Sequence, residues 1–395
     1  MKKLEKSVPV IRFKGFSEAR EQRKFIEIIN RLSKTSNSSI LPKVEYEDII
    51  AEEGRLNKDI SNKFDSRKGI LFQPKNILYG KLRPYLKNWL YPDFKGVAVG
   101  DFWVFEAIEA TPRFIYNLIQ SDSYQKVAND TAGTKMPRSD WTKVSNSSFF
   151  IPKESSEQKR IGTFFKQLDD TIALHQRKLD TLKQMKKGLL QQMFPKSEED
   201  VPKIRFADFD EEWYQRKLGE EFEKINERND GSFGKTHWIS VAKMYFVEPN
   251  KVLSNNIDTR TYVMRKGDIA FEGHSNTDFK FGRFVANDIG PGIVSELFPV
   301  YRHKTNYDNN YWKNAIQLEH IMAPIYSKSI TSSGNSSNKL DSKHFLNQKI
   351  YIADFEEQEK IGSIFKQLDN TIILYQNKLN KFDILKKAYL QTMFI

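Results

Sequence analysis

The chain has no cysteine, which excludes a disulfide framework and any thiolate metal site. Histidine is scarce, with six residues in 395, and none stands in the HxH or HExxH spacing of a zinc site. No apolar run approaches the roughly 20 residues that a membrane-spanning helix needs, and no apolar core of signal-peptide length follows the first residues. We therefore expect a soluble, cytoplasmic protein without a metal centre.

Catalytic motifs are also missing. The chain contains no Pro-Pro pair and no GxGxxG loop, which an amino-methyltransferase would need for its flipped base and its cofactor. Residues 234–236 (Gly-Lys-Thr) match the last three positions of the nucleotide-binding motif GxxxxGK[ST]. The first glycine of that motif is missing, because Asn229 occupies its position. We interpret that segment as a polar surface turn. We expect no enzyme activity and no bound cofactor in this chain.

Positive charge is abundant, with 63 Lys and Arg against 51 Asp and Glu, a net charge of +12. Such a field favours a polyanionic partner, with nucleic acid ahead of an anionic membrane surface. The length of 395 residues and a hydrophobic content of 39% are enough for two folded domains.

The chain repeats itself. Residues 157–194 and 357–394 align without a gap at an offset of 200, and 21 of 38 positions are identical. In both copies apolar residues recur at alternating spacings of four and three, with one interruption, at Lys186 and at Lys386. This pattern predicts two long helices, and the pairs Ser155/Gln158 and Asp354/Glu357 resemble capping boxes at their starts.

The shared apolar seam favours pairing of the two helices as an antiparallel coiled coil over two unrelated helices packed on separate domains. Some 40 residues at 1.5 Å each would make a spacer of about 60 Å. Leu174, Leu190, Leu374 and Leu390 lie off the seam and predict further apolar surface. The predicted pairing residues are Ile161, Phe165, Leu168, Ile172 and Leu179 in the first copy and Ile361, Phe365, Leu368, Ile372 and Leu379 in the second.

A second repeat indicates the topology. The segment VPVIRF at Val8–Phe13 returns as VPKIRF at Val201–Phe206, directly after the first helix. By symmetry the N-terminal copy should pack beside the end of the second helix, near Ile395. The chain would then be circular in space, with a pseudo-twofold axis. The predicted division is 1–152 for a first domain, 153–195 for a helix, 196–352 for a second domain and 353–395 for a second helix.

The two regions outside the helices are much less alike. Short β-rich runs divided by Gly, Pro, Asn and Ser clusters, such as 97–105 and 261–271, predict mixed α+β domains. The repeated helices and P-x-I-R-F segments form a duplicated frame, and the regions between them have diverged. This suggests that the frame fixes the arrangement of the chain while the divergent regions differ in what they bind. The faint correspondences are Val99–Val104 with Val294–Phe298, Asn76–Tyr79 with Asp268–Phe271, Gly133 with Gly334, and Asp140 with Asp341.

These features resemble the specificity subunits of type I restriction–modification enzymes. The resemblance is carried by the helix motif beginning EQKRIGTFFKQLDDTI, the P-x-I-R-F segments, GTKMPRSDW before the first helix, and LYGKLRPYLKN. It implies two target-recognition domains, each reading one half of an asymmetric, split DNA sequence. It further implies that the helices set the spacer and dock two methyltransferase (modification) subunits, which support two restriction motor-nuclease subunits. S-adenosylmethionine, ATP and Mg²⁺ would be bound by those partners.

DNA recognition needs cations for phosphates and amide or guanidinium groups for base edges. Glycine in a loop would permit close approach of the backbone to a phosphate. The second domain departs from the first in its loop, where SSGNSSNKLDS replaces GTKMPRSD. The candidates in the first domain are Lys75, Asn76, Tyr79, Lys81, Arg83, Tyr85, Lys87, Gly133, Thr134, Lys135 and Arg138. Those in the second domain are Arg265, Lys266, His274, Asn276, Lys280, Arg283, Asn335, Asn338 and Lys339.

Two other functions stay open at this stage. The first is an autonomous DNA-binding protein, such as a repressor or an architectural factor, and the apolar residues outside the seam argue against it. The second is a nuclease, for which no motif is present. A specificity subunit should copurify with methyltransferase chains, whereas an autonomous binder should not.

Overall fold

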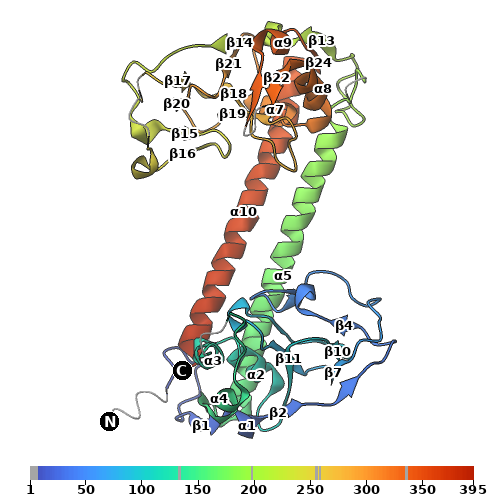
Figure 1. The fold of residues 1–395 in the computed structure, drawn as a ribbon, viewed down its shortest axis with the longest axis vertical. Coiled ribbons are helices and arrows are strands. Elements are labelled where there is room, and N and C mark those ends of the chain that lie inside the picture. The colour runs from blue at the N-terminus through green and yellow to red at the C-terminus, as the bar shows by residue number, and fades with distance from the viewer. Residues whose placement is uncertain (1–7, 132–134, 197–198, 254–256, 258, 334–336) are drawn as a thin grey trace. The chain divides into compact units, whose positions relative to one another are not determined.

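The computed structural model divides the chain into two compact units, Met1–Gln176 with Asn377–Ile395 and Arg177–Gln376 (Figure 1). The long helices α5 (Ser155–Gln192) and α10 (Phe355–Met393) each contribute residues to both units. Among the described helices, none combines the length and apolar composition that a membrane crossing requires. The structure describes residues 8–131, 135–196, 199–253, 257, 259–333 and 337–395.

The first unit is a mixed α/β domain with two four-stranded sheets, ordered β3-β7-β10-β4 and β2-β11-β8-β9, and two short strand pairs, β1-β12 and β5-β6. The strands are β1 Glu21–Lys24, β2 Ile29–Leu32, β3 Thr35–Ser36, β4 Lys43–Val44, β5 Ile49–Ile50, β6 Arg55–Leu56, β7 Gly69–Phe72, β8 Ile77–Gly80, β9 Trp89–Leu90, β10 Gly96–Ala98, β11 Phe102–Ala107 and β12 Ser148–Ile151. The shorter helices are α1 Phe25–Ile28, α2 Pro112–Leu118, α3 Asp122–Ala128 and α4 Trp141–Asn146.

The second unit repeats the central part of this topology. Its four-stranded sheet is ordered β14-β21-β18-β19, the counterpart of β2-β11-β8-β9, and β13-β24 matches β1-β12. The strands are β13 Tyr214–Lys217, β14 Phe222–Ile225, β15 Ile239–Ser240, β16 Tyr245–Phe246, β17 Thr261–Met264, β18 Ile269–Glu272, β19 Arg283–Ala286, β20 Gly292–Ser295, β21 Val300–His303, β22 Ile330–Ser333, β23 Asn338–Leu340 and β24 Lys349–Ile352. The shorter helices are α6 Leu218–Glu221, α7 Asn309–Ala315, α8 Glu319–Ser329 and α9 Ser342–Leu346.

Both long helices were predicted from the repeat and both are confirmed, but the predicted caps are only partly right. Asp354 caps α10 through its carboxylate, which accepts a hydrogen bond from the Glu357 N–H at 2.8 Å. The Ser155/Gln158 capping box is wrong, because Ser155 is already helical. The Gln158 side chain instead donates to the Pro152 carbonyl at 2.9 Å.

Within each unit the segments of α5 and α10 lie side by side and run in opposite directions. In the first unit Lys386 forms an ion pair with Asp169 at 2.9 Å, and the ring centroids of Phe165 and Phe394 are 6.1 Å apart. In the second unit Lys186 pairs with Asp369 at 2.6 Å. The two lysines that interrupt the apolar seam therefore bind a carboxylate on the facing helix.

The predicted pairing residues divide into two groups by burial. Ile172, Leu368 and Ile372 are half-buried, whereas Ile161, Phe165, Leu168, Leu179, Ile361, Phe365 and Leu379 are buried. Of the off-seam leucines, Leu174 and Leu374 are exposed, as predicted. The expectation was wrong for Leu390, which is buried in the core of the first unit, and Leu190 is half-buried against the core of the second. Both leucines are less exposed than expected because the ends of the helices pack into the domain cores.

Each P-x-I-R-F segment is attached to the start of a long helix by a bidentate ion pair. Arg12 donates to the carboxylate of Glu157 at 2.9 and 2.7 Å, and Arg205 donates to that of Glu357 at 2.8 and 2.8 Å. Both glutamates are buried. The N-terminal segment also lies beside the end of α10, as predicted, because the Ile11 N–H donates to the Thr392 carbonyl at 3.1 Å.

The third group at this anchor differs between the units. In the second unit the Trp213 indole N–H donates to Glu357 at 3.0 Å. In the first unit the equivalent position is Arg20, which lies 3.5 Å from Glu157 and donates to the Met393 carbonyl at 2.6 Å. Burial lowers the pKa of Arg20 to about 10 and outweighs its attraction to Glu157. Glu157 is thus the carboxylate that faces two guanidinium groups.

This difference predicts unequal costs for the same substitution. Glu157→Gln would leave the buried Arg20 without a counter-charge, which costs about 3–5 kcal/mol of unfolding free energy for a buried pair. Glu357→Gln should cost less, because Arg205 keeps partial access to water. Denaturant unfolding of both variants measures this, with Glu359→Gln, an exposed site on α10, as the control. Equal losses for the two variants would contradict the prediction.

Candidate nucleic-acid interface

Two candidate segments of the first unit meet at the end of β8. The Arg83 N–H donates to the Pro137 carbonyl at 2.7 Å, and the Ser139 N–H donates to the Lys81 carbonyl at 2.9 Å. Arg83 itself has a φ of 48°, in the left-handed region, where the chain turns sharply. The contact gathers the predicted side chains Lys81, Arg83, Tyr85, Lys135 and Arg138, which we call the β8 patch; all are exposed except Lys81, which is half-buried.

A carboxylate lies at the centre of the β8 patch. Arg138 donates from Nε and Nη2 to the two carboxylate oxygens of Asp101, at 3.3 and 3.0 Å. Lys81 lies 3.6 Å from the same carboxylate. The Arg138 guanidinium holds the pKa of Asp101 below its usual range, so the carboxylate remains ionised at neutral pH.

The backbone around Asp101 is tied to the same segments. Asp101 lies in the turn between β10 and β11, after Gly100, whose φ of +99° favours glycine. The Tyr46 hydroxyl donates to the Asp101 carbonyl at 2.6 Å and accepts from the Leu82 N–H at 3.0 Å. Burial raises the pKa of Tyr46, so its hydroxyl keeps the proton that it donates. Three separate parts of the chain are thereby held together.

The structure separates four candidates from this patch. Tyr79 is fully buried, with its ring packed between Trp103 and Tyr124. Asn76 is also buried, and its side-chain oxygen accepts from the Gln73 N–H. These two cannot reach DNA in this fold and are left out of the interface. The other two are Lys75, which is exposed at the opposite end of β8, and Lys87, which pairs with Glu52 at 3.1 Å.

The second unit brings the equivalent segments together. The Asn338 N–H donates to the Gly273 carbonyl at 2.9 Å. A Cβ at Gly273 would lie 2.2 Å from the Asn338 carbonyl oxygen, so this approach requires glycine. Exposed His274, Lys280 and Lys339 lie on these segments. The imidazole of His274 contacts Glu272 at 2.5 Å.

Two further candidates of the second unit are engaged in holding its loop. Arg283 donates to the Ala242 carbonyl at 2.5 Å and lies over the Phe279 ring at 4.7 Å. The side-chain oxygen of Asn276 accepts from the N–H groups of Asp278 and Phe279. In this conformation the side chains of Arg283 and Asn276 stabilise the loop through these contacts.

The remaining predicted residues are not at this end of the sheet or are not described. Arg265 and Lys266 lie at the opposite end of β18 from His274, and Arg265 pairs with Glu227 at 2.6 Å. Gly133, Thr134 and Asn335 lie outside the described residues, as does Gly334.

Sequence reasoning missed a second arginine cluster. Glu296 pairs with Arg228 at 2.7 Å and with Arg260 at 2.9 Å, and the Arg228 guanidinium lies 4.5 Å from the centre of the Tyr262 ring. Glu296 follows β20 just as Asp101 follows β10. The correspondence between Val99–Val104 and Val294–Phe298 aligns Asp101 with Glu296. An acidic residue at the same position in both segments was the sequence feature that could have indicated this cluster.

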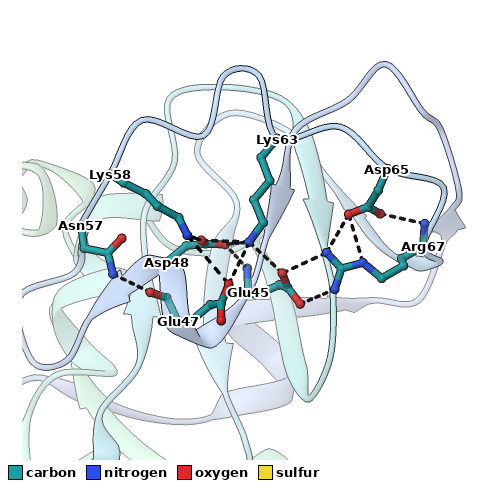
Figure 2. A network of polar contacts seen from close by, with 8 residues as sticks. All are labelled: Glu45, Glu47, Asp48, Asn57, Lys58, Lys63, Asp65 and Arg67. Atoms are coloured by element: carbon teal, nitrogen blue, oxygen red, sulfur yellow. Dashed lines mark hydrogen bonds and ion pairs between the residues drawn. The ribbon is translucent and has the colours of Figure 1, made fainter.

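Many other cations of the first unit are neutralised internally. Figure 2 shows Lys63 among three acidic side chains, at 2.7 Å from both Glu45 and Asp48. Arg67 binds Glu45 and Asp65 at 2.5 and 2.6 Å. These cations hold residues 45–67 together, so net charge alone does not locate a DNA-binding face.

Neither metal binding nor nucleotide binding gains support. Over the part of the chain that the structure describes, no three His, Asp or Glu side chains are grouped as metal ligands. The Gly234–Thr236 segment runs into a short 3-10 helix, Lys235–His237, with no buried residue, in agreement with a surface turn.

Comparison with known proteins points to one family. Residues 17–184 match the family described as the type I restriction modification DNA specificity domain. No curated protein sequence matches the chain. The S subunit of a type I restriction–modification system from M. genitalium has a similar fold, with a TM-score of 0.60, 13% identity, and coverage of 98% of this chain and 99% of that one. A chain from a structure on complex assembly and conformational transition of the type I R-M system has a TM-score of 0.53, 17% identity, and coverage of 94% and 96%.

The β8 patch predicts a salt-dependent effect of single lysines. If Lys135 contacts a phosphate, Lys135→Ala should lower the slope of log K against log salt by about 0.9, because one fewer counterion is released. Asn76→Ala should leave that slope unchanged, because Asn76 is buried. The measurement is a salt titration of DNA binding by the chain assembled with its partner subunits. An unchanged slope for Lys135→Ala would remove this residue from the interface.

Proposed function

The chain belongs to the family of type I restriction–modification specificity subunits, and on this premise we propose that it reads a bipartite, asymmetric DNA sequence and docks methyltransferase subunits. The observation that carries the proposal is the repetition of one local arrangement. In both units the segment after the central strand, β8 or β18, pairs with the segment before a short helix, α4 or α9. Two similar frames with different exposed side chains suit two different half-sites.

The short helices are positioned alike in both units. Asp140 accepts from the N–H groups of Thr142 and Lys143 at the start of α4, and Asp341 accepts from the His344 N–H at the start of α9. These are N-caps, so the repeated aspartates stabilise the frame. Base reading is therefore assigned to the residues before the caps, which differ between the units.

The long helices are proposed as the docking surface. Leu174 and Met185 on α5, and Leu374 and Leu385 on α10, are between 41% and 52% exposed and stand at repeated positions. An exposed apolar pair on each copy suits two modification subunits, which would in turn support two restriction motor-nuclease subunits. S-adenosylmethionine, ATP and Mg²⁺ would then act on those partners, and this chain would contribute recognition without catalysis. The paired helices would set the spacer between the half-sites.

Domain exchange tests the proposal. Replacing residues 20–150 with the equivalent region of a relative should change one half of the target and leave the other half unchanged, because each unit reads separately. Methylome sequencing of cells that carry the intact system identifies the target before and after the exchange. A change in both half-sites, or in neither, would contradict the two-reader arrangement. Copurification with methyltransferase chains would separate a specificity subunit from an autonomous DNA-binding protein.

A further inference from the structure

The ion pair between Asp101 and Arg138 leaves one edge of the guanidinium group free. Arg138 uses Nε and Nη2 to bind the carboxylate, at 3.3 and 3.0 Å. The opposite edge, formed by Nη1 and the second hydrogen of Nη2, has no acceptor among the described residues. The Arg138 side chain is 53% exposed, so this free edge is accessible to a ligand.

We propose that Asp101 is a positioning residue that holds Arg138 so that its free edge reads a guanine in one half-site. The inference rests on the proposed function and adds to it a named reader, the residue that orients it and the base that it recognises. Guanine presents O6 and N7 side by side in the major groove, and a planar guanidinium edge matches both acceptors.

The local charges favour a base over a phosphate as the ligand of Arg138. The Asp101 carboxylate is within hydrogen-bonding distance of the guanidinium and would repel a phosphate brought to it. Arg83 and Lys135 are exposed in the same patch and have no carboxylate partner among the described residues. Those two suit the phosphate backbone, while Arg138 suits a base edge.

Asp101 is itself rigidly placed, which positioning requires. Its carbonyl accepts from the Tyr46 hydroxyl at 2.6 Å and from the Lys81 N–H at 2.9 Å. A long arginine side chain loses much rotamer freedom when it binds. Because Asp101 removes part of that freedom before DNA arrives, the loss on binding is smaller.

The test measures base discrimination with duplexes in which each base pair of the target is varied in turn. Arg138→Ala should lower discrimination at one G·C pair by roughly 5- to 150-fold and leave the other positions unchanged. Arg138→Lys should do the same while it keeps the charge and the salt slope, because lysine lacks the fork. Asp101→Asn should weaken discrimination at the same pair, and it should add nothing when combined with Arg138→Ala.

Asp93→Asn is the matched control, since Asp93 is an exposed aspartate in the same unit. Two results would overturn the inference. One is that Asp101→Asn strengthens binding to all duplexes alike, as expected for an acid that only repels phosphate. The other is that Arg138→Lys retains every base preference, and this variant decides the question even if Asp101→Asn fails to fold. If the unaltered complex has no bipartite preference at all, the proposed function fails instead.

Discussion

A buried glutamate at the start of each long helix is the contact on which the rest of the structure depends. Glu157 and Glu357 each bind the arginine of a P-x-I-R-F segment through two hydrogen bonds. A buried carboxylate is tolerated only when its charge and its lone pairs are satisfied. The two ion pairs therefore join the P-x-I-R-F segment at the start of each domain to the long helix at its end. The paired residues are 145 and 152 positions apart in the chain.

The neighbouring glutamines continue the same attachment. Gln158 accepts from the Thr111 N–H at 2.8 Å, before α2, and Gln358 accepts from the Asp308 N–H at 3.4 Å, before α7. A Cβ at Gly362 would lie 1.9 Å from the Asp308 carboxylate oxygen that accepts from the Tyr311 N–H, so a side chain there would displace the cap of α7. The repeated Glu-Gln and Gly thus fix each helix start to its domain, and the rest of each domain is free to diverge.

Carboxylates also organise the exposed arginines. Asp101 binds Arg138 and Lys81, and Glu296 binds Arg228 and Arg260, from matching turns of the two units. An arginine held by a fixed carboxylate is oriented before it meets a ligand, whereas a free lysine is not. Arginines that a carboxylate holds in place are therefore suited to reading base edges, whereas free lysines are suited to binding phosphates.

The sequence by itself determined the frame. The repeat, its apolar spacing and the P-x-I-R-F segments predicted both helices and the place of the N-terminal segment, because helix periodicity and internal repetition are local signals. Only the tertiary structure decided which candidates face solvent. Asn76 and Tyr79 stand in a basic, aromatic stretch beside Lys81 and Arg83, yet Tyr79 lies in the fully buried strand β8 and Asn76, directly before that strand, is buried as well. The partnership of Asp101 with Arg138 joins residues 37 positions apart, and it was not predicted because no local pattern encodes which distant loops will meet.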